Sequence, residues 1–356
     1  MNIYEQELKF WASQDRLFEK LDNTPSTIMI SGATGMVGKC LVDLLMLHND
    51  ITDSSVKVIA LSRNAESARK RLWTYWDRKD FQYISCDINQ GIPECGAVDY
   101  IIHGASNTHP MQYSQDPIGT IASNVIGTKN LLDYAASHRA QHFCFLSTVE
   151  IYGENRGDTE KFNEEYLGYI DCNTLRAGYP ESKRLGETLC NAYHQAYDFD
   201  FSISRLSRIY GPTMLPSDSK AIAQFIKKAA AGEDIVLKSE GNQKFSYTFV
   251  TDVASAVLYT MLIGEPGQAY NAADECSDIT LKDLAAHMAE IAKSKVVFEL
   301  PEEVERRGYS TSTKGMLDAA KLRKLGWTPR VHIQEGLKDT INAFRKLTAA
   351  CETRDE

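Results

Sequence analysis

Three glycines near the start of the chain constrain its fold more than any other feature. They form the run Gly32-x-x-Gly35-x-x-Gly38, which follows the apolar segment 26–30 and precedes the helically periodic segment 39–46. A strand, a tight glycine turn and a helix in this order let the backbone approach a pyrophosphate, which the free N–H groups of the helix N-terminus then bind. The spacing differs from the Gly-x-Gly-x-x-Gly fingerprint, but its place between strand and helix predicts a dinucleotide site. The residues expected to contact the dinucleotide here are Gly32, Thr34, Gly35, Met36, Val37 and Gly38.

A second motif lies far downstream, where a tyrosine and a lysine stand four positions apart in the run Tyr179-Pro180-Glu181-Ser182-Lys183. Side chains at i and i+4 share one face of a helix, so the ammonium can act on the phenol. Free tyrosine has a pKa of about 10 and shuttles protons poorly at neutral pH unless a nearby positive charge favours its phenolate. Tyr179 and Lys183 are therefore candidates for the acid–base pair of a redox enzyme. The alternative is a pair that lies on the helix surface by chance. The glycine turn makes this alternative weaker, because it predicts a dinucleotide site in the same chain.

Short apolar segments alternate with helical ones up to residue 150. The predicted strands are residues 27–31, 56–61, 81–85, 98–103 and 142–147. Such alternation predicts an α/β fold with a Rossmann-type doubly wound parallel sheet, whose ligands bind at the carboxyl ends of the strands. Thr148 stands at one of these ends.

The length of 356 residues allows about two domains. We expect a helical N-terminal extension at 1–24 that packs against the body of the protein. A dinucleotide-binding domain with the catalytic helix follows at 25–208. Residues 209–356 are expected to form mainly a smaller C-terminal substrate lobe, with a helix at 221–232 and a segment near 245–263 that returns to the sheet.

The ordered motifs resemble those of the extended short-chain dehydrogenase/reductases of the NAD-dependent epimerase/dehydratase family, which modify nucleotide sugars. Besides the glycine run and the Tyr-x-x-x-Lys pair, the matching segments are 102–106, 124–128, 145–153, 205–212, 249–253 and 325–329. The resemblance covers nearly the whole chain. It implies an NAD or NADP cofactor, a nucleotide-sugar substrate and a homodimer built on two helices from each copy.

The resemblance also assigns roles to single residues. Thr148 is expected to hydrogen-bond the reacting sugar oxygen, Tyr179 to move its proton, and Lys183 to hold the nicotinamide ribose. The further residues implied to contact the cofactor are Asp87, Ile88, Gly104, Ala105, Ser106 and Asn124.

The two residues after Thr148 indicate the reaction. Sugar-nucleotide 4,6-dehydratases usually carry Asp-Glu there, whereas this chain has Val149-Glu150, and valine cannot protonate a leaving hydroxyl. A threonine, any residue and then glutamate resembles the UDP-glucuronate decarboxylases, as does the run 183–190. Glu150 is a candidate for moving a proton at the carbon beside a ketone. The alternative is a carboxylate that only caps the strand end.

Several positions depart from the family pattern. Ser62 and Arg63 follow the second strand, where NAD-preferring members carry an acidic residue, so they favour NADP over NAD. Arg208 replaces a common asparagine, and Phe245 replaces a common arginine. The residues expected to bind the substrate, several of them through its diphosphate, are Asn107, Thr148, Arg176, Arg208, Lys244, Arg306 and Arg307. For each arginine and lysine in this set, the alternative is a side chain that is exposed to solvent and binds no substrate.

Composition limits the remaining possibilities. A formal net charge of -9 argues against nucleic acid as a partner. The eight cysteines form no Cys-x-x-Cys pair or cluster with histidine, so we expect reduced thiols and no metal site. The charged N-terminus and the absence of a long apolar run predict a cytoplasmic protein with no membrane contact.

The sequence thus predicts an NAD(P)-dependent enzyme of polysaccharide precursor synthesis. Our first interpretation is oxidation of a sugar carbon to a transient keto intermediate, followed by epimerisation or decarboxylation. The second is an NADPH-dependent reductase of a nucleotide-linked keto sugar or ketose. A non-catalytic dinucleotide-binding sensor is disfavoured because Thr148, Tyr179 and Lys183 are all present.

Overall fold

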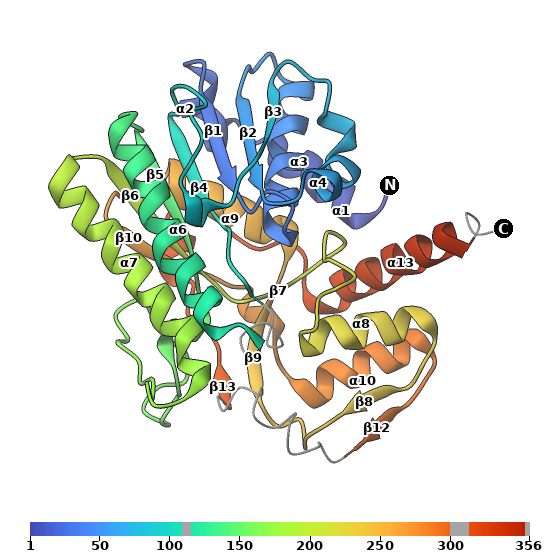
Figure 1. Cartoon of the computed structure of the whole chain (residues 1–356). Helices are drawn as coiled ribbons and strands as arrows, with labels where there is room; N and C mark the ends of the chain where they lie inside the picture. Colours follow the sequence, from blue (N-terminus) through green and yellow to red (C-terminus); the bar gives the residue numbers. More distant parts are fainter. Residues whose placement is uncertain (109–114, 300–312, 353–356) are drawn as a thin grey trace.

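A parallel sheet of seven strands forms the centre of the computed structural model, which describes residues 1–108, 115–299 and 313–352 (Figure 1). The strand order is β10-β6-β5-β4-β1-β2-β3, which confirms the predicted doubly wound sheet and places the reversal of strand order between β1 and β4. The strands are β1 (Thr27–Ser31), β2 (Lys57–Ser62), β3 (Phe81–Ser85), β4 (Tyr100–His103), β5 (His142–Thr148), β6 (Asp200–Leu206) and β10 (Gln268–Ala272).

Strand β4 begins two residues later than the sequence predicts. Asp99, the residue before β4, is joined to β1 in two ways: its backbone N–H donates to the Thr27 carbonyl at 3.0 Å, and its carboxylate accepts the Thr27 N–H at 2.8 Å. The other predicted strands agree with the structure to within one residue at each end.

Helices cover both faces of the sheet because side chains of a strand alternate between the faces. Ile28 and Ile30 belong to one core, while Met29 between them belongs to the other. The helices in the first core are α1 (Ile3–Ala12), α2 (Asp15–Asp22), α3 (Met36–Ile51) and α9 (Val250–Leu262). In the second are α6 (Pro117–Ser137) and α7 (Gly178–Tyr197), which lie side by side in Figure 1.

The N-terminal helices α1 and α2 pack against the body, as their apolar spacing predicts. Trp11 and Phe18 are buried in the first core, and the Tyr4 hydroxyl donates a hydrogen bond of 2.6 Å to Asp43 of α3. In the described part of the chain, no helix is both long enough and apolar enough to cross a bilayer.

The C-terminal half forms a smaller lobe with its own core (Figure 1). Within the segment 245–263, helix α9 covers the large sheet, and the strand β10 at 268–272 then joins that sheet at its edge. The helices of this half are α8 (Ala221–Ala231), α10 (Leu281–Ala292), α12 (Ala320–Lys324) and α13 (Ile333–Glu352). Its small sheets contain β7 (Arg208–Tyr210), β8 (Ile235–Leu237), β9 (Lys244–Phe249), β11 (Asp278–Thr280), β12 (Val296–Phe298) and β13 (Lys314–Gly315).

Asp252 of α9 holds the chain just before α13 and makes stability pH-dependent. Its carboxylate accepts the N–H groups of Arg330 at 3.0 Å and Val331 at 2.9 Å, and burial raises its pKa to about 7. An unfolded aspartate titrates near about 3.9, so between these values only the folded protein keeps the proton. We therefore expect the free energy of unfolding to fall as the pH rises from about 4 to 7. Chemical denaturation across this range should show a smaller fall in Asp252→Asn, and an equal fall in the variant would contradict the assignment.

Candidate active site

The glycine turn forms a close-packed cradle between β1 and α3. Gly32 has a φ of +74°, and a Cβ on it would lie 2.8 Å from the backbone nitrogen of Ala105. A Cβ on Gly38 would lie 2.3 Å from the carbonyl oxygen of Gly32. Helix α3 then begins after Gly35 without a side-chain cap, so its first N–H groups are available to an anion. The turn therefore has the steric and electrostatic form of a pyrophosphate site.

A buried histidine supports the loop that faces this turn. His103, at the end of β4, pairs through Nδ1 with the hydroxyl of Ser31 at 2.7 Å and through Nε2 with that of Thr128 at 2.9 Å. Burial lowers the pKa of His103 well below its usual value, which keeps the ring neutral. The Ser31 hydroxyl also accepts the Ala105 N–H, so this network positions the backbone after β4.

Asn124 of α6 connects the same loop to the start of α7. Its Oδ1 accepts the Ser106 hydroxyl at 2.7 Å, and its Nδ2 donates to the Ser182 hydroxyl at 2.9 Å. Ser182 in turn donates to the backbone carbonyl of Tyr179 at 2.8 Å. Asn124 thus acts here as a positioning residue for the first turn of α7.

Tyr179 and Lys183 lie on one face of α7, and both are largely buried. The Lys183 ammonium donates a hydrogen bond of 2.9 Å to the Leu146 carbonyl of β5 and lies 4.7 Å from the centre of the Phe145 ring. Burial lowers the pKa of Lys183 to about 8, although the nearby Glu187 carboxylate opposes this change. The lysine is therefore anchored to the strand that carries Thr148.

The end of β5 brings Thr148 and Glu150 to the same place. The Thr148 hydroxyl accepts the Glu150 N–H at 3.3 Å and begins the short helix η3 (Val149–Tyr152). The Glu150 carboxylate forms an ion pair of 2.7 Å with the guanidinium of Arg176, which precedes α7. Both side chains are partly exposed, so the ion pair is not sealed from water.

These elements enclose a cleft with a volume of about 260 Å³. The predicted site residues that line it are Gly32, Gly35, Met36, Val37, Gly38, Gly104, Ser106, Thr148, Glu150, Tyr179, Lys183 and Arg208. Those that do not line it are Thr34, Ser62, Arg63, Asp87, Ile88, Ala105, Asn107, Asn124, Arg176 and Lys244. Arg306 and Arg307 lie outside the described residues.

Three of the residues outside the lining lie at the ends of β2 and β3. The Ser62 hydroxyl is 3.2 Å from that of Tyr83, and the next residue, Arg63, is exposed. Asp87 is exposed and begins the short helix η2 (Ile88–Gln90). These positions fit the adenosine end of a dinucleotide that extends past the sheet edge from the glycine turn.

Arg208 of β7 contributes a cation from the C-terminal half. Its guanidinium carbon lies 3.6 Å from the centre of the Phe245 ring, a cation–π contact that fixes the planar group. Its Nε is buried and has no hydrogen-bond acceptor among the described residues. Arg208 also lines the cleft, so it places a positive charge at the site.

Sequence analysis missed several polar residues of the cleft. Lys220 donates to Asp218 at 3.1 Å and to Thr108 at 3.3 Å, so it connects the lobe to the loop after β4. A lysine before a predicted helix carries no signal of its own, and only the packing of the lobe places it here. The other polar residues missed are Ser31, Thr108, Ser147, Ser207 and Asp218.

The comparisons with known proteins agree with this geometry. The model of the NAD dependent epimerase/dehydratase family matches residues 28–273. UDP-glucuronic acid decarboxylase 1 of Xenopus tropicalis is 30% identical over 346 residues, which cover 95% of this chain and 75% of that protein. UDP-glucuronic acid decarboxylase 6 of Arabidopsis thaliana is 30% identical over 330 residues, which cover 89% of this chain and 88% of that protein.

Solved structures show the same fold at lower identity. A dTDP-glucose 4,6-dehydratase of Streptomyces venezuelae with bound NAD has a TM-score of 0.78 at 22% identity, covering 91% of this chain and 98% of that one. UDP-glucuronic acid 4-epimerase of Bacillus cereus, in complex with UDP-glucuronic acid and NAD, has a TM-score of 0.75 at 20% identity, with 90% and 99% covered. The match of the family model over most of the chain shows that this protein is an enzyme of the NAD dependent epimerase/dehydratase family.

Proposed function

We propose that this enzyme binds NAD and oxidises one carbon of a nucleotide-linked sugar to a transient ketone, with decarboxylation of a uronic acid as the first candidate for the overall reaction. The observation that carries the proposal is that Thr148, Tyr179 and Lys183 line one cleft together with the glycine turn. The identity to UDP-glucuronic acid decarboxylases supports the choice of a uronic acid.

Tyr179 is the proposed acid–base residue. As a phenolate it takes the proton of the sugar hydroxyl, and the ammonium of Lys183 favours that phenolate. The Thr148 hydroxyl holds the reacting oxygen in place and stabilises charge that develops on it. Bound NAD supplies the hydride acceptor and later the hydride donor, so the overall reaction needs no external oxidant.

Glu150 is the proposed residue for the next step. A ketone at the carbon two bonds from a carboxylate lets the carboxyl group leave as CO₂, because the bonding electrons pass to an enolate. The carbon then needs a proton, which Glu150 can direct from its place beside Thr148 at the cleft. Its ion pair with Arg176 holds the carboxylate in position and makes Arg176 a positioning residue in this proposal.

The test is incubation of the purified enzyme with UDP-glucuronic acid, followed by mass spectrometry of the nucleotide sugar. Loss of CO₂ supports decarboxylation, while an isomer of unchanged mass indicates epimerisation. Consumption of added NADPH with a keto sugar would move the reductase to first place. If no nucleotide sugar among the tested uronates and neutral hexoses turns over, the proposal is wrong. In Glu150→Gln a single turnover should still form reduced cofactor and release CO₂, but the final decarboxylated nucleotide sugar should form more slowly, because the enolate lacks the residue that delivers its proton.

The cofactor proposal can be tested separately. The family name and the NAD in the solved neighbours support NAD, whereas Ser62 and the exposed Arg63 favour NADP. Denaturing the purified protein and identifying the released dinucleotide by mass spectrometry distinguishes the two. Bound NAD supports a recycled cofactor, and an empty site that prefers NADPH supports net reduction.

Arg208 is the proposed anchor for the substrate diphosphate. A hydrogen bond to a charged group contributes about 1.5–3 kcal/mol, so Arg208→Met should weaken UDP binding by roughly 10- to 100-fold. Isothermal titration calorimetry measures this effect. Lys244→Met is the matched control, because Lys244 lies on the neighbouring strand but does not line the cleft. Equal affinities of Arg208→Met and the wild type would exclude this role.

We also propose a homodimer through the outer face of α6 and α7. These helices lie side by side (Figure 1). Their exposed large apolar side chains are Ile118, Ile121 and Ile126 of α6 and Leu185 of α7. Light scattering coupled to size-exclusion chromatography should give twice the chain mass, and Ile121→Arg should shift it toward the monomer. A monomeric wild type would contradict this assembly. We further propose that the chain divides at residue 208 into a dinucleotide-binding domain and a substrate-binding lobe. We also propose that the protein is cytoplasmic.

A further inference from the structure

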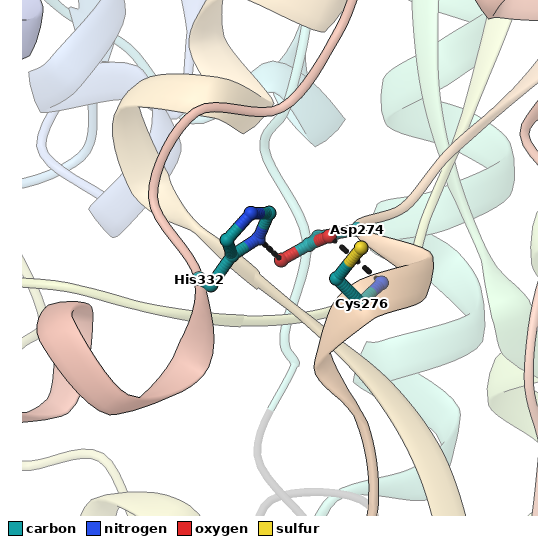
Figure 2. Close-up of side chains that lie close together, drawn as sticks. All are labelled: Asp274, Cys276 and His332. Carbon is teal, nitrogen blue, oxygen red and sulfur yellow. Dashed lines mark hydrogen bonds and ion pairs between the residues drawn. The ribbon is translucent and has the colours of Figure 1, made fainter.

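A second cluster of chemically active side chains lies outside the cleft. Asp274 and Cys276 follow β10, and His332 immediately precedes α13 (Figure 2). Their carboxylate, thiol and imidazole donor atoms all lie within 4.8 Å of one another. None of the three lines the cleft, so the proposed sugar chemistry does not use them.

The turn after β10 holds the carboxylate of this cluster in place. Asp274 is fully buried, and its Oδ1 accepts the Cys276 N–H at 3.0 Å. Its Oδ2 accepts the Ser277 hydroxyl and lies 2.8 Å from His332 Nδ1. Figure 2 shows the Asp274 carboxylate between Cys276 and His332, with the imidazole facing the carboxylate. The donor set is therefore organised before any ligand arrives.

We propose that Asp274, Cys276 and His332 bind one divalent transition-metal ion, with Zn²⁺ as the best match. One sulfur, one nitrogen and one oxygen are the donor types that zinc prefers, and three protein ligands leave a fourth position for water. Cys276 is exposed and the His332 side chain is half exposed, so the ion and its water have access from solvent. The ion takes the place of the proton between His332 and Asp274, and the thiol releases its own proton.

Electrostatics at the cluster favour a cation. The carboxylate of Glu335 also acts on His332, so negative charge faces the imidazole from α13 as well as from Asp274. The Ser277 hydroxyl, which donates to Asp274 and accepts the N–H of Ile333, provides the outer support typical of metal sites.

The consequence of binding is mechanical. Asp274 and Cys276 belong to the turn at the end of the large sheet, whereas His332 begins a helix that packs in the core of the C-terminal lobe. A bound ion therefore connects the start of α13 to the large sheet. It stabilises the folded protein without taking part in the proposed sugar chemistry. This proposal does not depend on the proposed sugar chemistry.

The test is titration of the full-length, chelator-treated protein with Co²⁺ and Zn²⁺. Tetrahedral Co²⁺ bound to a thiolate gives a ligand-to-metal charge-transfer band, which Cys276→Ser should abolish. Loss of an outer-shell partner typically weakens metal binding by roughly 10- to 100-fold. Because Cys276 and His332 are proposed as direct ligands, Cys276→Ser and His332→Gln should each weaken Zn²⁺ binding by at least this factor. Zn²⁺ should raise the Tm of the wild type but not of these variants. Asp274 is left intact because its carboxylate also holds the turn.

Two matched variants control for unspecific binding. Cys172→Ser removes another exposed thiol, and His287→Gln removes a partly exposed imidazole from α10. Both should bind Co²⁺ and Zn²⁺ like the wild type. The proposal is overturned if Cys276→Ser and His332→Gln retain the wild-type Zn²⁺ affinity and charge-transfer band, or if the controls lose them equally.

Discussion

Tyr179→Phe is expected to lower turnover by about 10²- to 10⁴-fold, the range that a positioned general acid–base group contributes. The substitution removes only the hydroxyl that accepts the sugar proton. Tyr179 is buried at the cleft beside Thr148 and Lys183, so no other described phenol can take its place there. The measurement is formation of reduced cofactor in a single turnover with the nucleotide sugar.

The control for this variant is Tyr197→Phe, which removes an exposed hydroxyl from the end of the same helix. Its turnover should equal that of the wild type. Tyr179→Phe should still copurify with dinucleotide and melt at the wild-type temperature, which separates a chemical loss from a folding loss. Wild-type turnover in Tyr179→Phe would remove this residue from the mechanism.

Lys183→Met is expected to lower turnover by at least about 100-fold because the phenolate loses its cation and the cofactor ribose loses its proposed partner. We expect the variant to fold. Lowering the pKa of Lys183 from its ordinary value of 10.5 to about 8 means that burying the charge costs about 3 kcal/mol at neutral pH. Loss of the hydrogen bond to the Leu146 carbonyl costs about 1–3 kcal/mol, so the two effects largely cancel.

The pH dependence of stability gives an independent measure of the same charge. Between about pH 8 and 10.5 the folded protein has released the Lys183 proton, whereas the unfolded chain still holds it. The free energy of unfolding therefore gains a contribution that rises with pH over this window, and Lys183→Met should lack it. Arg184→Met, at the next and more exposed position of α7, should keep the wild-type rise. The same slope in Lys183→Met and the wild type would show that Lys183 is not buried as a charge.

Much of the fold could be predicted because its signals are local. The glycine spacing requires close backbone approaches, which the structure shows at Gly32 and Gly38. The i, i+4 spacing of Tyr179 and Lys183 needs only a helix. Strand and helix periodicity predicted the doubly wound sheet for the same reason, although β4 begins two residues later than its apolar run predicts.

Residues of the candidate site could be predicted best where several of them belong to one sequence motif. Thr148, Tyr179 and Lys183 line the cleft, whereas Asn107, Lys244 and Arg176 do not. A basic side chain expected for a substrate can instead pair with a nearby carboxylate, as Arg176 does with Glu150. Whether a cation faces a ligand or a neighbour depends on the packing around it, which residue type alone does not reveal.

By itself, the sequence determined the α/β class, the glycine turn and the shared helix face of Tyr179 and Lys183, because each depends on residues close together along the chain. The family resemblance came from the order of such local motifs. The tertiary structure alone decided that Arg208 stacks on Phe245, that Lys220 reaches the cleft and that Cys276 lies beside His332. These contacts join segments that are far apart along the chain and meet only in the folded protein. Their geometry follows from burial of shared apolar surface, which has no fixed spacing along the chain.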